Sequence, residues 1–511
     1  MSKNTRCQAG RKVWSATLVT AVALLLAISA SAEPKPQPQT STQSVGNAAT
    51  TGQWSTPANW GVEAIHLILL HTGKVLGFGY PQGDATNVPA MLLDPTNGNV
   101  KDVTVPWPNS DFFCGAQTVL SDGRVLVTGG LLGNPYPGVP DYGIALTGFF
   151  DPVSESWTQG KNMNYSRWYP TSIELNDGTI LEVTGKDQNA HYVEINETYD
   201  PVADKWTILP PSANVSHGHD TYLKLHVLPT GKVFDAGGDA ETMVFSPKTN
   251  IWKPLGTMNF GDRYHGAAVL MPGNPNKVFA FGGTQTYMGG GATASAEVID
   301  TSATNPQWTY VTSENHARYN ANYVILMDGT ILAVGGATLA RYDGPVMIPE
   351  LYDPATDSMW TDMAPQSNPR PYHSTALLLP DGRVISAGSD NPGNYTYDKQ
   401  YDIFSPPYLF KGPRPSFTIT ATSLGYNQAF TITTAHPDQV GKVALVRPGA
   451  VTHDNDMDQR YLTLTNTVGT GVLNVTSPIN ASTAPPGWYM LTIVSKQGVP
   501  AIAQWVQVGA N

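Results

Sequence analysis

The sequence predicts an all-β fold in two domains, a seven-bladed β-propeller followed by a smaller β-sandwich. Three observations predict it: a turn-and-strand pattern that returns about every fifty residues, a run of differently spaced short strands after it, and a composition rich in glycine and proline. The chain has 511 residues with 49 Gly and 41 Pro, and 14% of its residues are charged. This composition excludes a coiled coil or helical bundle, and the many aromatic residues exclude a disordered chain.

The N-terminus is typical of a secretory signal peptide. Four basic residues lie between positions 3 and 12, an apolar run spans 19–28, and small residues end the segment at Ala32. We therefore expect residues 1–32 to be cleaved, which makes the protein secreted or periplasmic, with no membrane association after cleavage. An uncleaved membrane anchor is the alternative, although the apolar run is short for a span of about 20 residues. Residues 33–53, rich in Pro, Gln, Ser and Thr, are predicted to be a linker.

Seven copies of one pattern follow, each with a turn, a short apolar strand and then small residues. The turn glycine favours a tight hairpin, and the small residues allow neighbouring strands to approach closely. One copy has lysine in place of the glycine. The central turn residues are Gly73, Gly123, Gly178, Gly231, Lys277, Gly329 and Gly382.

A second repeated motif lies between these turns. It is an Asp-Pro type turn that leads into a strand with tryptophan, as in FDPVSESW from Phe150 and YDPVADKW from Tyr199. A period near fifty with both motifs is the kelch pattern, in which each blade has four strands; a solenoid, the alternative, has shorter repeats. We assign residues 54–411 to a seven-bladed propeller and expect Trp54 to add the outer strand of its last blade.

After residue 411 the period stops, but short strands continue. About seven strands in some hundred residues predict an immunoglobulin-like sandwich over 412–511. The acidic net charge of −11, without basic runs, argues against a nucleic-acid partner. We expect a monomer.

Only one cysteine remains after signal cleavage, because Cys7 leaves with the signal. Cys114 therefore has no partner for an internal disulfide. It is either a buried small apolar residue or a sulfur used in other chemistry.

The repeat register brings chemically active residues to one position. Counting back nine residues from the turn glycine of three repeats gives Cys114, Tyr169 and His373, with Tyr372 beside His373. This position begins the innermost strand of a blade, so these side chains should form a ring at one channel mouth. Pro369 and Pro371 indicate that the strand has not begun at Tyr372. The matching residues in the other repeats are Tyr222, His265 (allowing two extra turn residues), Asn320 and Ala64.

A thiol, phenols and imidazole at one mouth suit a copper ion. The alternative is a polar channel rim in which tyrosine and histidine only satisfy hydrogen bonds. Five further histidines share no register, and we expect them to be structural or exposed: His66, His71, His226, His316 and His436.

Four segments together resemble the secreted copper radical oxidases of the galactose oxidase and glyoxal oxidase kind. They are DFFCGAQ, SRWYPTS, RPYHSTALLLPDGRV and VTHDNDMDQRYLTL, and PPGWYMLTI is also similar to the family's last domain. The resemblance runs from about Trp54 to the C-terminus.

This resemblance implies one copper ion as cofactor and specific roles for five residues. Tyr169 would be a copper ligand joined to Cys114 by a thioether and would carry a radical. His373 and His453 would be the imidazole ligands, and Tyr372 the axial ligand and the base. Small aldehydes or primary alcohols would be oxidised by O2, with hydrogen peroxide as the second product.

The resemblance also has departures. Where galactose oxidase has an indole over the cross-linked tyrosine, this chain has Lys186-Asp187-Gln188, and Trp168 or His191 is the candidate replacement. The sugar-contacting arginine has no clear counterpart; His217 and His219 lie in that region. Arg167-Trp168-Tyr169-Pro170 is more similar to the glyoxal oxidase branch, so the resemblance favours small aldehydes or primary alcohols over galactose. A non-catalytic kelch propeller that binds glycan or protein, and a slow relative with a structural role, are the alternatives.

Overall fold

The computed structural model describes residues 47–79, 81, 87–132, 142–215, 222–287, 289–391 and 396–509. The predicted signal peptide, residues 33–46 of the predicted linker, and His217 and His219 lie outside the described residues. Among the described residues, no helix has the length and apolar character needed to cross a membrane. Residues at the end of the predicted linker form a short helix, α1 (Ala48–Thr51), and the strand β1 (Gln53–Trp54).

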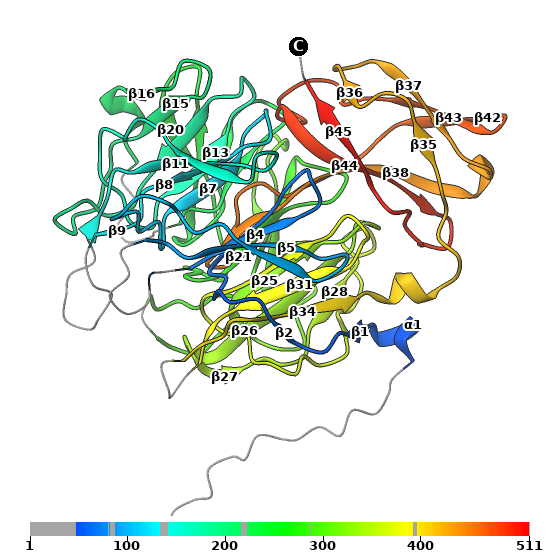
Figure 1. Cartoon of the computed structure of the whole chain (residues 1–511), viewed down its shortest axis with the longest axis horizontal. Coiled ribbons are helices and arrows are strands. Elements are labelled where there is room, and N and C mark those ends of the chain that lie inside the picture. The colour runs from blue at the N-terminus through cyan, green and yellow to red at the C-terminus, as the bar shows by residue number, and fades with distance from the viewer. Residues whose placement is uncertain are drawn as a thin grey trace, which may run out of the picture. The chain divides into compact units, whose positions relative to one another are not determined.

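The chain is almost entirely β-structure, as predicted (Figure 1). Within the described part of the 53–405 region, seven antiparallel sheets contain at least four strands each, and we call them sheets 1 to 7 in chain order. Their first four strands are, for sheet 1, β3 (His66–Leu69), β4 (Val75–Phe78), β5 (Ala90–Asp94) and β6 (Asn99–Asp102); for sheet 2, β7 (Ala116–Val119), β8 (Val125–Thr128), β11 (Thr147–Asp151) and β12 (Ser156–Gln159); for sheet 3, β13 (Thr171–Glu174), β14 (Ile180–Val183), β15 (Glu197–Asp200) and β16 (Lys205–Ile208); for sheet 4, β17 (Leu225–Val227), β18 (Val233–Asp235), β19 (Glu241–Ser246) and β20 (Ile251–Thr257); for sheet 5, β21 (Ala267–Leu270), β22 (Lys277–Phe281), β23 (Ala296–Asp300) and β24 (Trp308–Val311); for sheet 6, β25 (Tyr319–Ile325), β26 (Ile331–Ala340), β28 (Glu350–Tyr352) and β29 (Thr361–Asp362); and for sheet 7, β30 (Ser374–Leu378), β31 (Val384–Gly388), β34 (Gln400–Ser405) and β1.

Sheet 7 is completed by β1, which precedes sheet 1 in the sequence. Trp54 in β1 pairs with Phe404 in β34, which confirms that Trp54 adds the outer strand of the last sheet. The remaining elements of this region are short: β2 (Ala58–Asn59), β9 (Leu131–Leu132), β10 (Tyr142–Gly143), β27 (Asp343–Pro345), β32 (Asp390–Asn391), β33 (Thr396–Tyr397), and the 3-10 helices η1 (Pro211–Ala213) and η2 (Pro407–Phe410).

The repeated motifs have clear structural reasons. The turn glycines connect the first and second strands of a sheet and adopt positive φ, for example 93° at Gly123, where a side chain would be strained. The repeated tryptophans bond to a neighbouring segment: Trp157 Nε1 donates to the Val103 carbonyl (2.6 Å), and Trp206 Nε1 donates to the Lys161 carbonyl (2.9 Å). Each outer strand is thereby tied to the sheet before it.

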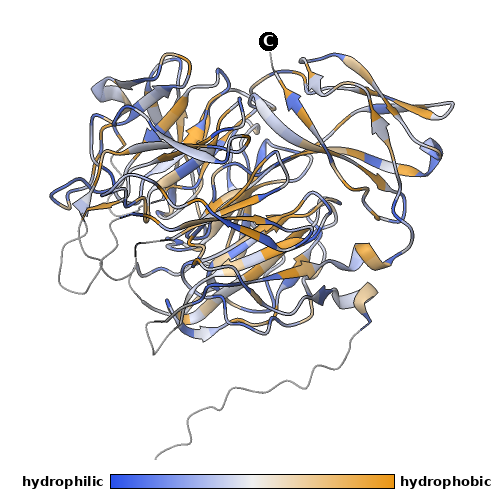
Figure 2. Ribbon diagram, in the orientation of Figure 1, coloured by the Kyte–Doolittle hydropathy of each residue, from blue (hydrophilic) through white to orange (hydrophobic). Residues whose placement is uncertain are grey.

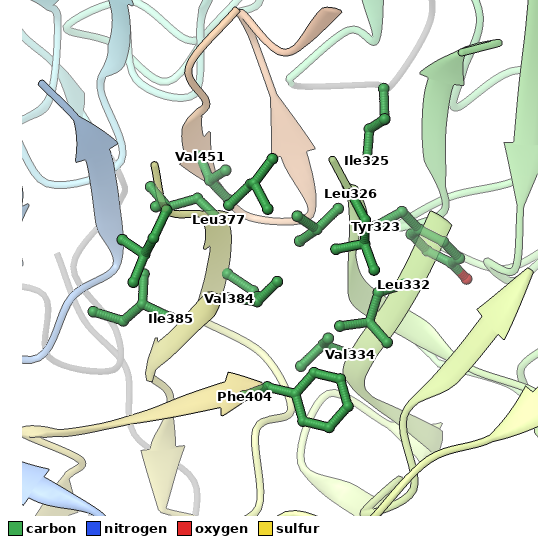
Figure 3. Close-up of a cluster of buried hydrophobic side chains, with 14 of the residues drawn as sticks. Tyr323, Ile325, Leu326, Leu332, Val334, Leu377, Val384, Ile385, Phe404 and Val451 are labelled. Atoms are coloured by element: carbon green, nitrogen blue, oxygen red, sulfur yellow. The ribbon is translucent and has the colours of Figure 1, made fainter. Parts of the chain in front are cut away.

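The first strands of successive sheets lie side by side around a common centre. β13 contacts both β7 and β17, β25 contacts both β21 and β30, and β30 contacts β3. The strands are rich in apolar residues and many of the connecting turns are hydrophilic (Figure 2). Buried apolar side chains from neighbouring sheets form shared clusters. Figure 3 shows Leu332 and Val334 of sheet 6 facing Val384 and Phe404 of sheet 7, with Val451 from the C-terminal part of the chain in the same cluster.

The C-terminal part is a two-layer sandwich. Its strands are β35 (Thr418–Ile419), β37 (Ala429–Thr433), β43 (Val472–Thr476) and β42 (Asn466–Gly469) in one sheet, and β36 (Ser423–Leu424), β45 (Gln504–Val508), β44 (Gly487–Ser495), β38 (Val440–Arg447) and β41 (Arg460–Thr463) in the other, with the 3-10 helix η3 (Pro437–Gln439) before β38. A separate apolar core lies between these sheets. One hairpin, β39 (Ala450–Thr452) and β40 (Asn455–Asp456), leaves the sandwich and joins sheet 1 beside β3.

Candidate metal centre

We call the position that aligns Cys114, Tyr169 and His373 in the repeats the register position. It has one backbone conformation in six of the seven sheets. Cys114, Tyr169 and His373 have φ of 55°, 63° and 64°, and the matching residues of sheets 4, 5 and 6 have φ between 55° and 60°. His373 lies immediately before its first strand, and Cys114 and Tyr169 lie two residues before theirs, each at the end of a turn or bend. In sheet 2, for example, Gly115 N donates to the Phe112 carbonyl, so Cys114 occupies a turn position that favours glycine. A residue with a side chain adopts this conformation only when its surroundings hold it.

Main-chain hydrogen bonds connect the register residues around the centre. Tyr169 N donates to the Cys114 carbonyl (2.8 Å), and Tyr222 N donates to the Tyr169 carbonyl (3.2 Å). Asn320 N donates to the His265 carbonyl in the same way (2.9 Å). Main-chain hydrogen bonds therefore join the register residues of sheets 2, 3 and 4, and those of sheets 5 and 6.

In four sheets a buried arginine lies just before the register residue, a feature that the sequence analysis missed. Each arginine lies two or three residues before the register residue, and each pairs with an acidic residue on the third strand of its sheet. The available clue was an arginine followed by a tyrosine one or two residues later in all four sheets. The pairs are Arg167–Glu197, Arg263–Glu297, Arg318–Glu350 and Arg370–Asp402.

The hairpin β39–β40 brings His453 into the same centre. His453 and Asp454 form its tip, with φ of 48° and 62°. The Asp454 carboxylate forms a buried ion pair with Lys224 and accepts a hydrogen bond from Asn320 Nδ2 (2.8 Å). The tip is thereby fixed to sheets 4 and 6.

The structure brings all five predicted site residues together. One ligand atom each from Cys114, His373 and His453 lies within 4.8 Å of the others. Cys114 Sγ is 3.4 Å from His453 Nε2, and the His373 and His453 ring centroids are 4.7 Å apart. The hydroxyl groups of Tyr169 and Tyr372 are hydrogen-bonded to each other.

The electrostatics keep His453 and Tyr169 uncharged. Burial, together with the neighbouring His373, lowers the pKa of His453 well below the usual value, so its ring is neutral. Its Nδ1 is 2.6 Å from Thr452 Oγ1, and its Nε2 faces the cluster. Loss of solvation, together with Cys114 and Tyr372, raises the pKa of Tyr169 well above the usual value. A bound cation would reverse that direction, because it favours the phenolate.

This donor set fits a copper ion. It combines two imidazoles with phenol oxygens and a sulfur, and copper accepts imidazole ligands readily. The cluster is also almost closed to water, since Cys114, Tyr372, His373 and His453 are all buried. Such a centre can bind one metal ion and shield it from water.

Trp168, one of the two candidate replacements for the indole, lies against Tyr169. Their ring centroids are 4.1 Å apart at 66°. His191, the other candidate, has a side chain that is 80% exposed and lies near Asp187. Arg341, from sheet 6, lies over the Tyr372 ring at 4.7 Å and was not identified from the sequence.

His66, which the sequence analysis set aside, is at the centre. It is fully buried, and its Nε2 is 3.2 Å from Cys114 N. Burial lowers its pKa to about 3, so the ring is neutral. The sequence analysis missed this role because His66 lies two residues after Ala64, the register residue of sheet 1. His316 contacts Asp362 away from this centre, and His436 is exposed.

The sequence and fold of this chain are similar to those of known copper and aldehyde oxidases. Residues 83–408 match the family described as glyoxal oxidase N-terminus, and residues 414–508 match the galactose oxidase-like early set domain. A galactose oxidase of Gibberella zeae is 31% identical over 81% of this chain, which spans 63% of that protein's length. An aldehyde oxidase of Arabidopsis thaliana is 27% identical over 82% of this chain and 74% of its own length. A solved structure of a fungal alcohol oxidase in complex with copper has a TM-score of 0.80 at 27% identity, and covers 90% of this chain and 100% of its own.

Proposed function

Because the chain belongs to the copper radical oxidase family of galactose oxidase and glyoxal oxidase, we propose that it is a secreted, monomeric, mononuclear copper oxidase. Its substrates are small aldehydes, as their hydrates, or primary alcohols. Dioxygen accepts the two electrons and two protons and leaves as hydrogen peroxide. The observation that carries this proposal is the meeting of Cys114, Tyr169, Tyr372, His373 and His453 at one buried centre.

The architecture in this proposal is a seven-bladed propeller over residues 54–411, in which sheets 1 to 7 are the blades. Support comes from the side-by-side first strands and from the closure of sheet 7 by β1. The sandwich over 412–511 supplies one ligand through the hairpin β39–β40. Residues 1–32 are the cleaved signal of this secreted protein.

Each of the five residues has a role at the copper. His373 and His453 are the neutral imidazole ligands, and the Thr452 hydroxyl fixes the ring of His453 through Nδ1. Tyr169, joined to Cys114 by a thioether, and Tyr372 would be the two phenol ligands. Tyr169 packs against the buried cluster that contains Cys114, and the Tyr169 and His453 ring centroids are 4.8 Å apart, which supports this assignment.

Tyr169 and Tyr372 each remove one hydrogen from the substrate. Tyr372 takes the hydroxyl proton of the substrate, and Tyr169, as a radical, takes the hydrogen atom from the carbon. Their hydroxyl groups are in contact, so one substrate oxygen and its carbon can reach both. When bound, copper supplies the other oxidising equivalent and acidifies the substrate hydroxyl. An aldehyde hydrate and O2 then give a carboxylic acid and hydrogen peroxide.

The surroundings of Tyr169 favour a small substrate. The Trp168 ring and the buried Tyr222 ring, 4.7 Å from Tyr169, occupy space around it. Arg341 lies across Tyr372 and adds a positive charge beside the reacting oxygen. A small polar carbonyl compound suits this environment better than a sugar, so we favour glyoxal oxidase-like activity.

The decisive experiment combines mass and activity. Copper is added aerobically to the mature protein, and intact mass with peptide mapping follows the Cys114 and Tyr169 peptides. The expected result is loss of two hydrogens with the two peptides joined, and peroxide formation with glyoxal-type aldehydes in excess of that with galactose. Cys114→Ala is the control that binds copper without the cross-link. A thiol that still reacts with alkylating agents when copper is bound would contradict the radical mechanism and favour a binding protein.

A further inference from the structure

The hydrogen bond made by the Cys114 backbone differs from those of three other register residues. Tyr169, Tyr222 and Asn320 each donate N–H to the carbonyl of the preceding register residue. By that pattern Cys114 N would donate to Ala64. The Ala64 carbonyl instead accepts from the Thr375 hydroxyl (2.8 Å), and Cys114 N donates to the side chain of His66 (3.2 Å). A side chain thus accepts at Cys114 where a main-chain carbonyl accepts in the other three cases.

The His66 ring is held in one orientation and one tautomer. It stacks on Phe78 with centroids 4.3 Å apart and planes 6° apart. Its Nδ1 is 2.7 Å from Gln117 Oε1. A backbone N–H can only donate, so His66 Nε2 must be the acceptor, and the proton must lie on Nδ1 and be donated to Gln117. Gln117 and Cys114 belong to the same turn-and-strand segment, so His66 bridges its two ends.

We propose that His66 is a positioning residue that holds the Cys114 backbone in the left-handed conformation from which its sulfur reaches Tyr169. This proposal rests on the proposed function. His66 acts on the nitrogen side of Cys114, and Tyr169 N acts on its carbonyl side, so the residue is fixed from both neighbouring sheets. Without His66 the turn can relax to an ordinary negative φ, which redirects the Cα–Cβ bond and moves Sγ away from the ring.

The step that depends on this geometry is the cross-link itself. The Cys114 S–H bond and one ortho C–H bond of Tyr169 break, and one S–C bond forms. Two electrons and two protons leave the protein, and dioxygen, in the presence of copper, takes them up as hydrogen peroxide. Because the reaction joins two groups that are already neighbours, its rate depends on how often sulfur and ring carbon are correctly placed.

The test compares rates of cross-linking in three variants made without copper. The reaction is started with copper and air, and is followed by the loss of two hydrogens and of alkylatable thiol. For His66→Phe, which keeps the stacking on Phe78, we expect a rate about tenfold lower, the effect of a lost buried hydrogen bond. His66→Gln should restore the rate to within about threefold, since its amide oxygen can accept from Cys114 N. His226→Phe is the matched control, because His226 is buried on the first strand of sheet 4 and pairs with Phe234 as His66 pairs with Phe78.

Copper affinity separates positioning from general damage. All three variants keep the proposed ligands, so copper binding measured by chelator competition should stay near the wild-type value while the rate falls only for His66→Phe. If that variant does not fold, Gln117→Leu removes the acceptor that fixes the tautomer and should also slow the reaction. Wild-type rates in His66→Phe, or in Gln117→Leu when that variant is used, would overturn the proposal. If copper-loaded wild type itself never cross-links, the proposed function fails first and this proposal fails with it.

Discussion

Asp454 connects the stability of the C-terminal hairpin to the metal centre, and Asp454→Asn tests that connection. Its carboxylate is paired with Lys224, and the two side chains are 2% and 6% exposed. Removing one partner of a buried ion pair costs about 3–5 kcal/mol. Asparagine keeps one acceptor oxygen for Asn320 or Lys224, so we expect about 3 kcal/mol, at the low end of that range.

This loss of free energy can weaken either copper binding or the stability of the fold. If the hairpin β39–β40 leaves the centre while the rest stays folded, the cost falls on the binding of copper through His453. About 3 kcal/mol then corresponds to roughly a hundredfold weaker copper binding, since 1.4 kcal/mol is a factor of ten. If the hairpin cannot leave, the cost lowers the thermal unfolding temperature instead.

Chelator competition for copper and a thermal melt of the metal-depleted protein distinguish these outcomes. Asp438→Asn, an identical change at an exposed position of the same domain, should alter neither. The double variant Lys224→Gln with Asp454→Asn removes both charges and should recover most of the loss. Copper affinity and melting temperature both equal to wild type in Asp454→Asn would refute the idea that this ion pair holds the ligand-bearing hairpin.

Two further predictions concern the reaction and the pH dependence. Tyr372→Phe removes the proposed base while its ring remains, so kcat should fall by about 10²–10⁴-fold. Copper affinity should fall less than in His373→Ala. Peroxide release measures the first effect and chelator competition the second, and an undiminished kcat would exclude Tyr372 as the base. Glu182, buried beside Thr128 and Ser172, has its pKa raised from 4.5 to about 7 by desolvation, so its contribution to stability is present below pH 4.5 and is lost as the pH rises through 7. Glu182→Gln should therefore be more stable than wild type at pH 8, by about 3 kcal/mol, and equal to it near pH 4; melts that shift equally at both pH values would contradict the prediction.

Much of the fold and part of the centre could be predicted because the propeller region repeats. The turn glycines fix the start of the second strand, so a nearly constant count backward reaches the same backbone position in six of the seven sheets. That count identified Cys114, Tyr169 and His373, whose φ values agree within 10°. Periodicity carries information about position, and side-chain chemistry is then read at that position.

What the count could not reach lies outside the period. His453 comes from the sandwich, and only the family resemblance pointed to it. The partner of Asp454, Lys224, is 230 residues away in the sequence, and no local pattern joins them. His66 is two residues beyond the register position, where a strand residue normally serves the core. These contacts are fixed by how the hairpin and sheets pack, which a one-dimensional pattern does not contain.

The hairpin and the exception at sheet 1 have a common explanation. Ala64, the register residue of sheet 1, has no side chain that can bind a metal or reach the centre. β39 lies beside β3 and also contacts β7, so the hairpin enters between the first strands of sheets 1 and 2. The hairpin therefore brings His453 to the centre next to the sheet whose register residue offers no ligand, and the His66 ring accepts the hydrogen bond from Cys114 N. Six similar positions become an asymmetric centre because the seventh is alanine, and the sandwich and a neighbouring strand residue supply what that position lacks.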